Sequence, residues 1–215
     1  LNDDIMRASF LGSAGQQAHI ILMPGNHLFE CSAVEYNDYS HYRADIPLSG
    51  LEAGQEYNII MQLTAPDPGD GTKRKRLLSP HTLSVKEAVD FPLARVIREN
   101  SRLTYNIGSP RLGGPLRSEP AAGTLLKLSG RFGSKYRVRL SNTEIGYIDS
   151  ADLELMPQAR VKPSYYITSM SCGPSSTADL LSIPYPEPVP WEIHPDPAGK
   201  RIVISLYGVQ TSSTW

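Results

Sequence analysis

The 215-residue chain has no apolar stretch that approaches the roughly 18–20 residues of a membrane-spanning helix, so we expect no membrane span. It also shows no signal peptide. The first residue is Leu1 rather than methionine, which favours a processed or trimmed N-terminus and leaves the question of export open.

Cysteine is scarce as well. Cys31 and Cys172 are the only two and lie far apart in the sequence, so neither a disulfide framework nor a cysteine metal pair can be argued. The charged residues nearly balance, with 21 Lys and Arg against 22 Asp and Glu. By composition the chain is an ordinary folded protein, and the patterning of its residues carries more information.

The near balance of charge hides an asymmetry along the chain. Residues 1–92 carry 7 Lys and Arg against 12 Asp and Glu, residues 93–160 carry 11 against 6, and residues 161–215 carry 3 against 4. These differences predict separate modules. The basic middle module is compatible with an anionic partner, although a surplus of this size more often belongs to a solvated surface.

Short strands dominate the pattern. The 18 prolines and 17 glycines favour many short elements over long helices. The stretch YRADIPL (residues 42–48) alternates apolar residues with others, and YNIIMQL (residues 57–63) does the same. A period of two marks strands with one buried face. We therefore predict an all-β fold.

The first module, residues 1–92, is predicted to be a β-sandwich. Two strand-like runs within residues 18–34 flank a Pro-Gly-Asn turn, which predicts a hairpin. Leu51, Gly54 and Tyr57 follow a Leu-x-x-Gly-x-x-Tyr spacing. This motif resembles fibronectin-III and immunoglobulin-like sandwiches, in which such a tyrosine caps a corner by bonding its hydroxyl to nearby backbone.

A basic run from Lys73 to Arg76 interrupts this module. Four cations without interleaved aromatic residues are a weak footprint for nucleic acid, and a Pro/Gly/Asp-rich turn precedes them. We expect a solvated hairpin and no nucleic-acid partner. The stretch SVKEAVDFPL that follows is predicted to form a short helical turn or a linker.

The second module, residues 93–160, is predicted to be a small barrel. Residues 123–155 divide into three short strands with tight turns, then a 3-10 turn and a closing strand. The segments YRVRL, EIGYID and SADLEL resemble those of bacterial SH3 domains. Tyr136 and Tyr147 stand where that family frequently has tryptophan, and the opening segment is divergent.

Bacterial SH3 domains commonly bind wall peptides or pack on a catalytic unit, so the resemblance implies a binding role. The candidate binding residues are Tyr105, Arg137, Arg139 and Tyr147. Alternation favours core packing for Tyr136 and Tyr147 over a ligand role, and places the two arginines on the solvated face.

The third module, residues 161–215, has its own resemblance. The segments IPY (residues 183–185) and LYGVQTSSTW (residues 206–215) are similar to the start of the AMIN-like region of N-acetylmuramoyl-L-alanine amidases of the Bacteroidetes type. Together with the SH3-like segment, the resemblance covers residues 93–215. In those proteins a zinc hydrolase domain follows, so the strand at 202–207 is expected to be incompletely paired and Trp215 incompletely packed.

A catalytic zinc site is not expected in this chain. Zinc amidases need histidine and carboxylate ligands that converge on the metal, with one position open to water. The family's first ligand lies in an Asp-Pro-Gly-His-type loop, and no histidine here has that context. We therefore expect no cofactor in the chain itself, with zinc confined to a downstream domain. The five histidines are His19, His27, His41, His81 and His194.

A cysteine peptidase is a less favoured alternative. The stretch around Cys172, SMSCGPSST, resembles the start of the nucleophile helix in papain-like peptidases. A thiolate needs a histidine base and an orienting group, and the downstream candidates are His194 and Asp196. Pro184, Pro186, Pro188 and Pro190 break the segment after Cys172, so a free cysteine in a turn is the favoured interpretation.

The resemblance therefore implies a non-catalytic targeting or regulatory region of a peptidoglycan amidase. Its expected location is the periplasm or cell envelope. Its expected partners are peptidoglycan or its stem peptides, and a downstream catalytic domain. A stand-alone adhesion or peptidoglycan-binding protein is the alternative from another class.

Overall fold

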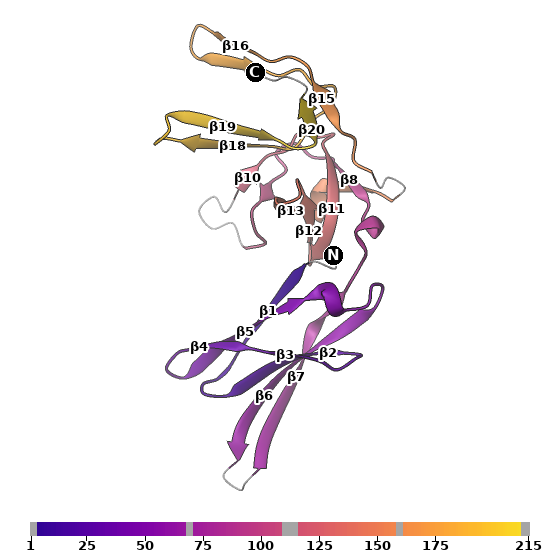
Figure 1. Cartoon of the computed structure of the whole chain (residues 1–215), viewed down its shortest axis with the longest axis vertical. Helices are drawn as coiled ribbons and strands as arrows, with labels where there is room; N and C mark the ends of the chain where they lie inside the picture. The colour runs from indigo at the N-terminus through magenta and orange to yellow at the C-terminus, as the bar shows by residue number, and fades with distance from the viewer. Residues whose placement is uncertain (1–3, 68–70, 109–115, 158–160, 212–215) are drawn as a thin grey trace. The chain divides into compact units, whose positions relative to one another are not determined.

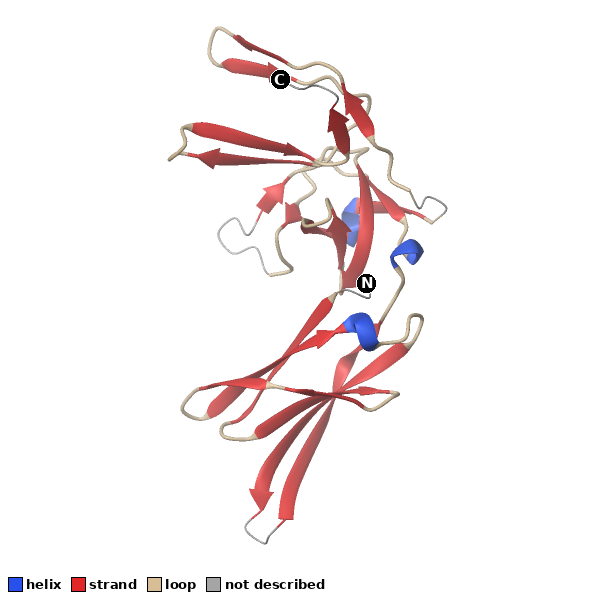
Figure 2. Ribbon diagram, in the orientation of Figure 1, coloured by secondary structure: helices blue, strands red, loops and turns tan. Residues whose placement is uncertain are grey.

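The computed structural model describes residues 4–67, 71–108, 116–157 and 161–211. Strands make up most of these ranges, and the helices in them are three single 3-10 turns (Figures 1 and 2). The predicted all-β class is confirmed. The chain divides into two compact units, Leu1–Ala88 and Val89–Trp215.

The first unit is a sandwich of two antiparallel sheets around one core. The pairing orders, β1-β5-β4 and β3-β2-β6-β7, correspond to strands B-E-D and C′-C-F-G of immunoglobulin-like sandwiches. The strands are β1 Ile5–Ser13, β2 Gln17–Met23, β3 His27–Glu30, β4 Ser32–Glu35, β5 Tyr39–Pro47, β6 Glu56–Asp67 and β7 Gly71–Ser84.

Alternation along the chain decides which face of each sheet is buried. In β5, Tyr42, Ala44 and Ile46 are all buried, while the residues between them point away from the core. Ile20 and Leu22 of β2 join Ala44 and Ile46 in one core cluster from the facing sheet. Burying a large aliphatic side chain contributes about 1.5–3 kcal/mol, so this pattern fixes the pairing register.

The corner before β6 follows the predicted motif. The 3-10 turn η1 (Leu48–Gly50) leads to Gly54, whose φ of +85° suits glycine. The backbone N–H of Glu52 then donates to the Tyr57 hydroxyl at 2.9 Å. The predicted capping of this corner by tyrosine is confirmed.

Replacing Tyr57 with phenylalanine is expected to lower the free energy of unfolding of the first unit by about 1 kcal/mol, because the Glu52 N–H loses its acceptor while the ring stays buried. Urea unfolding followed by circular dichroism measures the change. Tyr36→Phe, at an exposed position in the same unit, is the matched control and should leave the midpoint unchanged. Equal unfolding midpoints for the two variants would show that the hydrogen bond between Glu52 and Tyr57 does not stabilise the first unit.

The second unit is built on a seven-stranded antiparallel sheet with the order β10-β9-β13-β12-β11-β8-β14. The predicted 3-10 turn before the closing strand is η3 (Ser150–Asp152), and the predicted helical turn upstream is η2 (Ala88–Asp90). The strands are β8 Leu93–Val96, β9 Leu103–Thr104, β10 Leu116–Ser118, β11 Leu125–Phe132, β12 Lys135–Arg139, β13 Ile145–Asp149 and β14 Leu153–Met156.

This sheet does not close, which corrects the expectation of a small barrel. Closure would require β10 to pair with β14, yet they are the two edges of the described sheet. Strand β10 lies instead beside β18 (Trp191–Asp196) of the C-terminal segment. A strand whose free side is covered by another hairpin has no need of a partner across a barrel.

The core of the second unit lies on one face of the sheet. Val138 of β12 and Ile148 of β13 are fully buried, and Tyr136 packs against the same cluster. The expected core packing of Tyr136 is confirmed. The same expectation for Tyr147 is wrong, because Tyr147 is the cross-strand partner of Arg137 and lies on the face opposite the buried Ile148. A Cβ on Gly146 would lie 2.8 Å from the Leu103 Cδ1, so the close approach of β13 to β9 requires glycine there.

The C-terminal segment forms three two-stranded sheets. Within the described residues β19 pairs only with β18, and the observed strand starts at Arg201, one residue before the predicted start. Trp215 lies outside the described residues. The other strands are β15 Tyr165–Ile167, β16 Ser171–Pro174, β17 Asp179–Ser182 and β20 Val209–Thr211, and β19 is Arg201–Leu206.

The segment belongs to the same compact unit as the seven-stranded sheet. Tyr207 packs against the core of that sheet, and its backbone N–H donates to the Pro190 carbonyl at 2.9 Å. The predicted module boundary at residue 160 therefore lies inside the second unit and stays a prediction.

Candidate functional site

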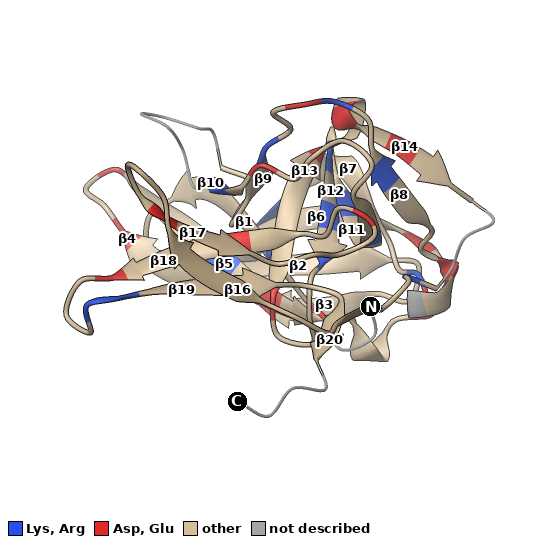
Figure 3. Ribbon diagram, turned by 90° about the horizontal axis from the view of Figure 1, so that it is seen from above, with Lys and Arg blue, Asp and Glu red and all other residues tan. Residues whose placement is uncertain are grey.

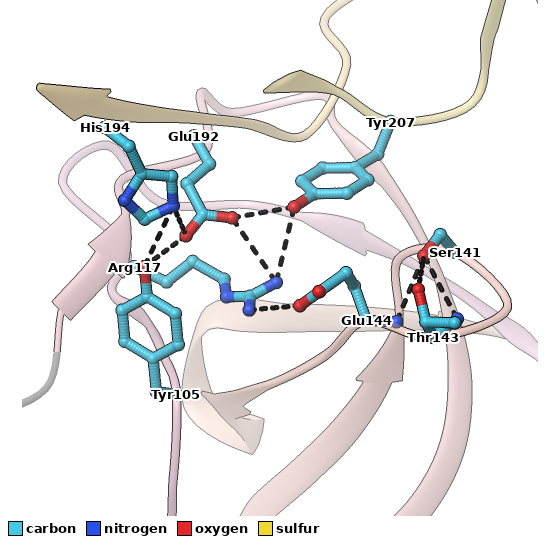
Figure 4. Close-up of polar contacts among 8 residues, drawn as sticks. All are labelled: Tyr105, Arg117, Ser141, Thr143, Glu144, Glu192, His194 and Tyr207. Carbon is cyan, nitrogen blue, oxygen red and sulfur yellow. Dashed lines mark hydrogen bonds and ion pairs between the residues drawn. The ribbon is translucent and has the colours of Figure 1, made fainter. Parts of the chain in front are cut away.

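A cluster of polar side chains lies where the β18–β19 hairpin meets the seven-stranded sheet (Figure 4). Its members come from the end of β9, from β10, from the turn before β13 and from the hairpin. We call it the Glu192 cluster; it consists of Tyr105, Arg117, Glu144, Glu192, His194 and Tyr207.

Glu192 is the centre of the cluster. Its side chain is only 3% exposed, and a carboxylate buried this deeply needs partners. Tyr207 donates its hydroxyl to Glu192 Oε2 at 2.7 Å, Tyr105 donates to Oε1, and Arg117 Nη1 lies 3.4 Å from Oε2. Burial alone would raise the pKa of Glu192, but the two hydroxyl donors and the nearby cations together lower it. The carboxylate is therefore ionised at neutral pH.

Arg117 supplies the buried positive charge. Its side chain is 6% exposed, its Nη2 donates to Glu144 Oε2 at 2.5 Å, and its guanidinium lies 4.5 Å from the Tyr105 ring centroid. Burial opposes the charge, but the hydrogen bond to Glu144 and the charge of Glu192 outweigh it and raise the pKa of Arg117. Its Nε has no hydrogen-bond partner among the described residues.

The turn between β12 and β13 positions Glu144. The Ser141 hydroxyl accepts hydrogen bonds from the backbone N–H groups of Thr143 (3.2 Å) and Glu144 (3.0 Å), which is the usual way a serine closes a short turn. The Leu140 N–H donates to the Glu144 carbonyl at 2.9 Å. The short turn thus holds the Glu144 carboxylate toward Arg117 (Figure 4).

The two phenols act as donors over the whole physiological range. Burial and the hydrogen bond to Glu192 raise the pKa of Tyr105 to about 12, and the same causes raise the pKa of Tyr207. Both hydroxyls therefore keep their protons. Together with Arg117 they satisfy the Glu192 carboxylate, which favours a structural role over acid–base chemistry for this group.

His194 forms the solvent-facing edge of the cluster. Its Nε2 lies 2.5 Å from Glu192 Oε1 and 3.4 Å from the Tyr105 hydroxyl, while its side chain is 52% exposed. A carboxylate can orient a histidine for catalysis or for metal binding. Across the part of the chain that the structure describes, no group of three or more His, Cys, Asp or Glu side chains is placed to hold a metal ion.

The structure separates the predicted binding residues into two places. Tyr105 belongs to the Glu192 cluster. Arg137, Arg139 and Tyr147 lie together on the outer face of β12 and β13, where Arg137 is the direct cross-strand partner of Tyr147. Arg137 also donates from Nη2 to the Ser129 carbonyl at 2.7 Å, and Arg139 is exposed.

Apart from Tyr105, the sequence singled out only His194, as a possible base for Cys172. It did not reveal Glu192, because the hairpin reverses the usual pattern of buried apolar residues. In β18 the buried residue is Glu192, whereas its apolar neighbour Ile193 is 48% exposed. Period-two reasoning alone would place Ile193 inward. The available signal was Glu192 itself, a carboxylate placed directly between the apolar residues Trp191 and Ile193.

The residues considered for a cysteine nucleophile are not joined by a hydrogen bond in the described structure. Cys172 lies in β16 and is exposed, while His194 lies in β18 with its Nε2 directed at Glu192. The basic run at Lys73 to Arg76 lies in β7, in a hairpin with β6, as expected for a solvated hairpin.

No family model, curated protein or solved structure matches this chain. None of the described helices is long and apolar enough to cross a membrane. Function must therefore be argued from the residues and their geometry.

Proposed function

We propose that this chain is a non-catalytic wall-binding and positioning region of a peptidoglycan amidase, working in the periplasm or cell envelope. The sequence resemblance to N-acetylmuramoyl-L-alanine amidases motivates the proposal. Peptidoglycan or its stem peptides are the proposed ligand, and a zinc hydrolase domain is the proposed functional partner.

The observation that carries the proposal is the basic outer face shared by β11, β12 and β13. Arg137, Arg139 and Tyr147 share this face, opposite the buried Val138 and Ile148. Stem peptides carry carboxylates, for which arginine is a well-matched partner because it donates two parallel hydrogen bonds. The basic residues on this face are Lys127, Lys135, Arg137 and Arg139, since the register pairs Lys127 with Arg139 and Arg137 with Tyr147. Arg131 lies on the other face, where it pairs with Tyr136 and its guanidinium is 5.3 Å from the centroid of that ring. Lys and Arg residues are drawn in blue in Figure 3.

The Glu192 cluster supports the positioning part of the proposal. It joins the β18–β19 hairpin to the seven-stranded sheet through buried charges and hydroxyl donors. A hairpin held in this way has a fixed orientation on the sheet and could position the proposed hydrolase domain.

Sedimentation with purified peptidoglycan tests the proposal. The wild-type chain should be retained at low ionic strength, and Arg137→Gln/Arg139→Gln should weaken retention about tenfold through the loss of two charge-assisted contacts. Arg74→Gln/Lys75→Gln removes the same charge from the first unit and is the matched control. Absence of wild-type retention, or equal weakening by the control, would rule out this face as the binding surface.

A further inference from the structure

The outer face of the three-stranded sheet in the first unit carries a continuous strip of aromatic and polar side chains. It runs along the β4–β5 hairpin, on the side opposite the buried Tyr42, Ala44 and Ile46. We call it the Tyr36 strip; it consists of Ser32, Val34, Tyr36, Tyr39, His41, Arg43 and Asp45.

The aromatic end of the strip lies at the hairpin turn. Tyr36 and Tyr39 stack with ring centroids 4.8 Å apart and an interplanar angle of 17°, and the Tyr36 N–H donates to the Tyr39 carbonyl at 2.8 Å. Their side chains nevertheless remain 49% and 43% exposed. Two rings held rigidly in solvent form a platform that costs little conformational entropy on binding.

The polar end of the strip is a surface pocket of about 400 Å³. Cross-strand pairing places Ser32 beside Arg43 and Val34 beside His41, and Glu30 reaches the same pocket from β3. Arg43 Nη2 lies 3.5 Å from Asp45 Oδ2. The pocket thus presents donors and acceptors of both charge signs next to the aromatic platform.

We propose that the Tyr36 strip is a carbohydrate-binding site that takes a glycan of pyranose rings. The C–H groups on one side of a pyranose carry partial positive charge and pack on the negative face of an aromatic ring. Sugar hydroxyls both donate and accept hydrogen bonds, so they match Arg43, Asp45 and Glu30 together.

A charged polymer fits the strip less well. An acidic polymer would be repelled by Glu30 and a basic one by Arg43. Asp45 is already ion-paired with Arg7 at 2.8 Å and with Arg43 at 3.5 Å. A neutral polyhydroxylated chain meets no like charge at any point of the pocket. This inference does not depend on the proposed function, because it concerns other residues in the other unit.

Nuclear magnetic resonance titration of the full ¹⁵N-labelled chain tests the proposal, with N-acetylglucosamine hexasaccharide and cellohexaose as separate probes. We expect at least one probe to shift the amides of β4, β5 and their turn. Tyr36→Ala/Tyr39→Ala should weaken that binding about tenfold, while Tyr36→Phe/Tyr39→Phe keeps both rings and stays within about twofold of wild type.

The exposed Tyr166 of the second unit provides the matched control, and Tyr166→Ala should bind like wild type. Response to one probe alone would identify whether the acetamido group is recognised. The proposal is overturned if neither hexasaccharide shifts the β4–β5 amides up to about 10 mM, or if the double alanine variant binds as tightly as wild type. The two proposals can fail separately. If the hexasaccharides bind the Tyr36 strip but the substitutions at Arg137 and Arg139 do not affect peptidoglycan retention, the carbohydrate site stands and only the proposed binding role of the basic face is refuted.

Discussion

Replacement of Glu192 by leucine is expected to lower the free energy of unfolding of the second unit by about 3–5 kcal/mol. The variant removes the carboxylate that accepts from Tyr105 and Tyr207, and it leaves the buried Arg117 with Glu144 as its remaining carboxylate partner. Breaking one side of a buried charge cluster is costly because the other side stays desolvated.

Urea unfolding followed by tryptophan fluorescence measures this loss, because Trp191 lies in β18 of the second unit and residues 1–88 contain no tryptophan. The control is Glu154→Leu, which breaks an exposed ion pair with Arg95 and should cost no more than about 1 kcal/mol. If Glu192→Leu cost as little as the control, the cluster would not be what holds the hairpin to the sheet.

The same variant should change the response to acid. The pKa of Glu192 in the folded protein lies below its ordinary value of 4.5, so its ionised form stabilises the folded state above that value. This contribution disappears as the pH falls through the lowered pKa. The stability difference between wild type and Glu192→Leu should therefore be largest near neutral pH and shrink in acid.

Truncation of Tyr42 to alanine is expected to lower the free energy of unfolding of the first unit by about 3–5 kcal/mol. The ring is 1% exposed and stacks with Phe10 at a centroid distance of 5.4 Å. Its hydroxyl donates to the Ser13 carbonyl at 2.7 Å and accepts from the Gln16 N–H at 3.1 Å. The alanine variant loses both the packing and these bonds.

Tyr42→Phe separates the two contributions, since it keeps the ring and should cost only about 1–2 kcal/mol. Tyr39→Ala, at an exposed position in the same strand, should change stability by less than about 0.5 kcal/mol. Native-state hydrogen exchange of the β5 amides measures all three variants. If the β5 amides exchanged as slowly in Tyr42→Ala as in Tyr42→Phe, the packing of the Tyr42 ring would not stabilise the first unit.

Much of the fold could be predicted because its strands bury one face. The buried residues of β5 follow a strict alternation, and the tyrosine at the corner before β6 has a recognisable spacing. The turn at Ser150–Asp152 and the strand after it also follow from local sequence. In these elements local preference and tertiary packing agree.

The candidate site could be predicted only in part. Tyr105 was identified, but its partners Arg117 and Glu192 come from segments that are distant in sequence and lack any shared motif. Burial of Glu192 depends on these distant partners, so the residues next to it in the sequence do not predict that it is buried. The open sheet was missed for a related reason, because the covering of β10 by β18 is a long-range contact.

The position of the first strand of the second unit sets the order in which that unit can fold. Strand β8 pairs with both β11 and β14, so the sheet cannot be completed before residue 156 has left the ribosome. Arg117 must wait longer, because its buried partner Glu192 is synthesised later still. During synthesis the β18–β19 hairpin can therefore dock only after every strand of the seven-stranded sheet has been made.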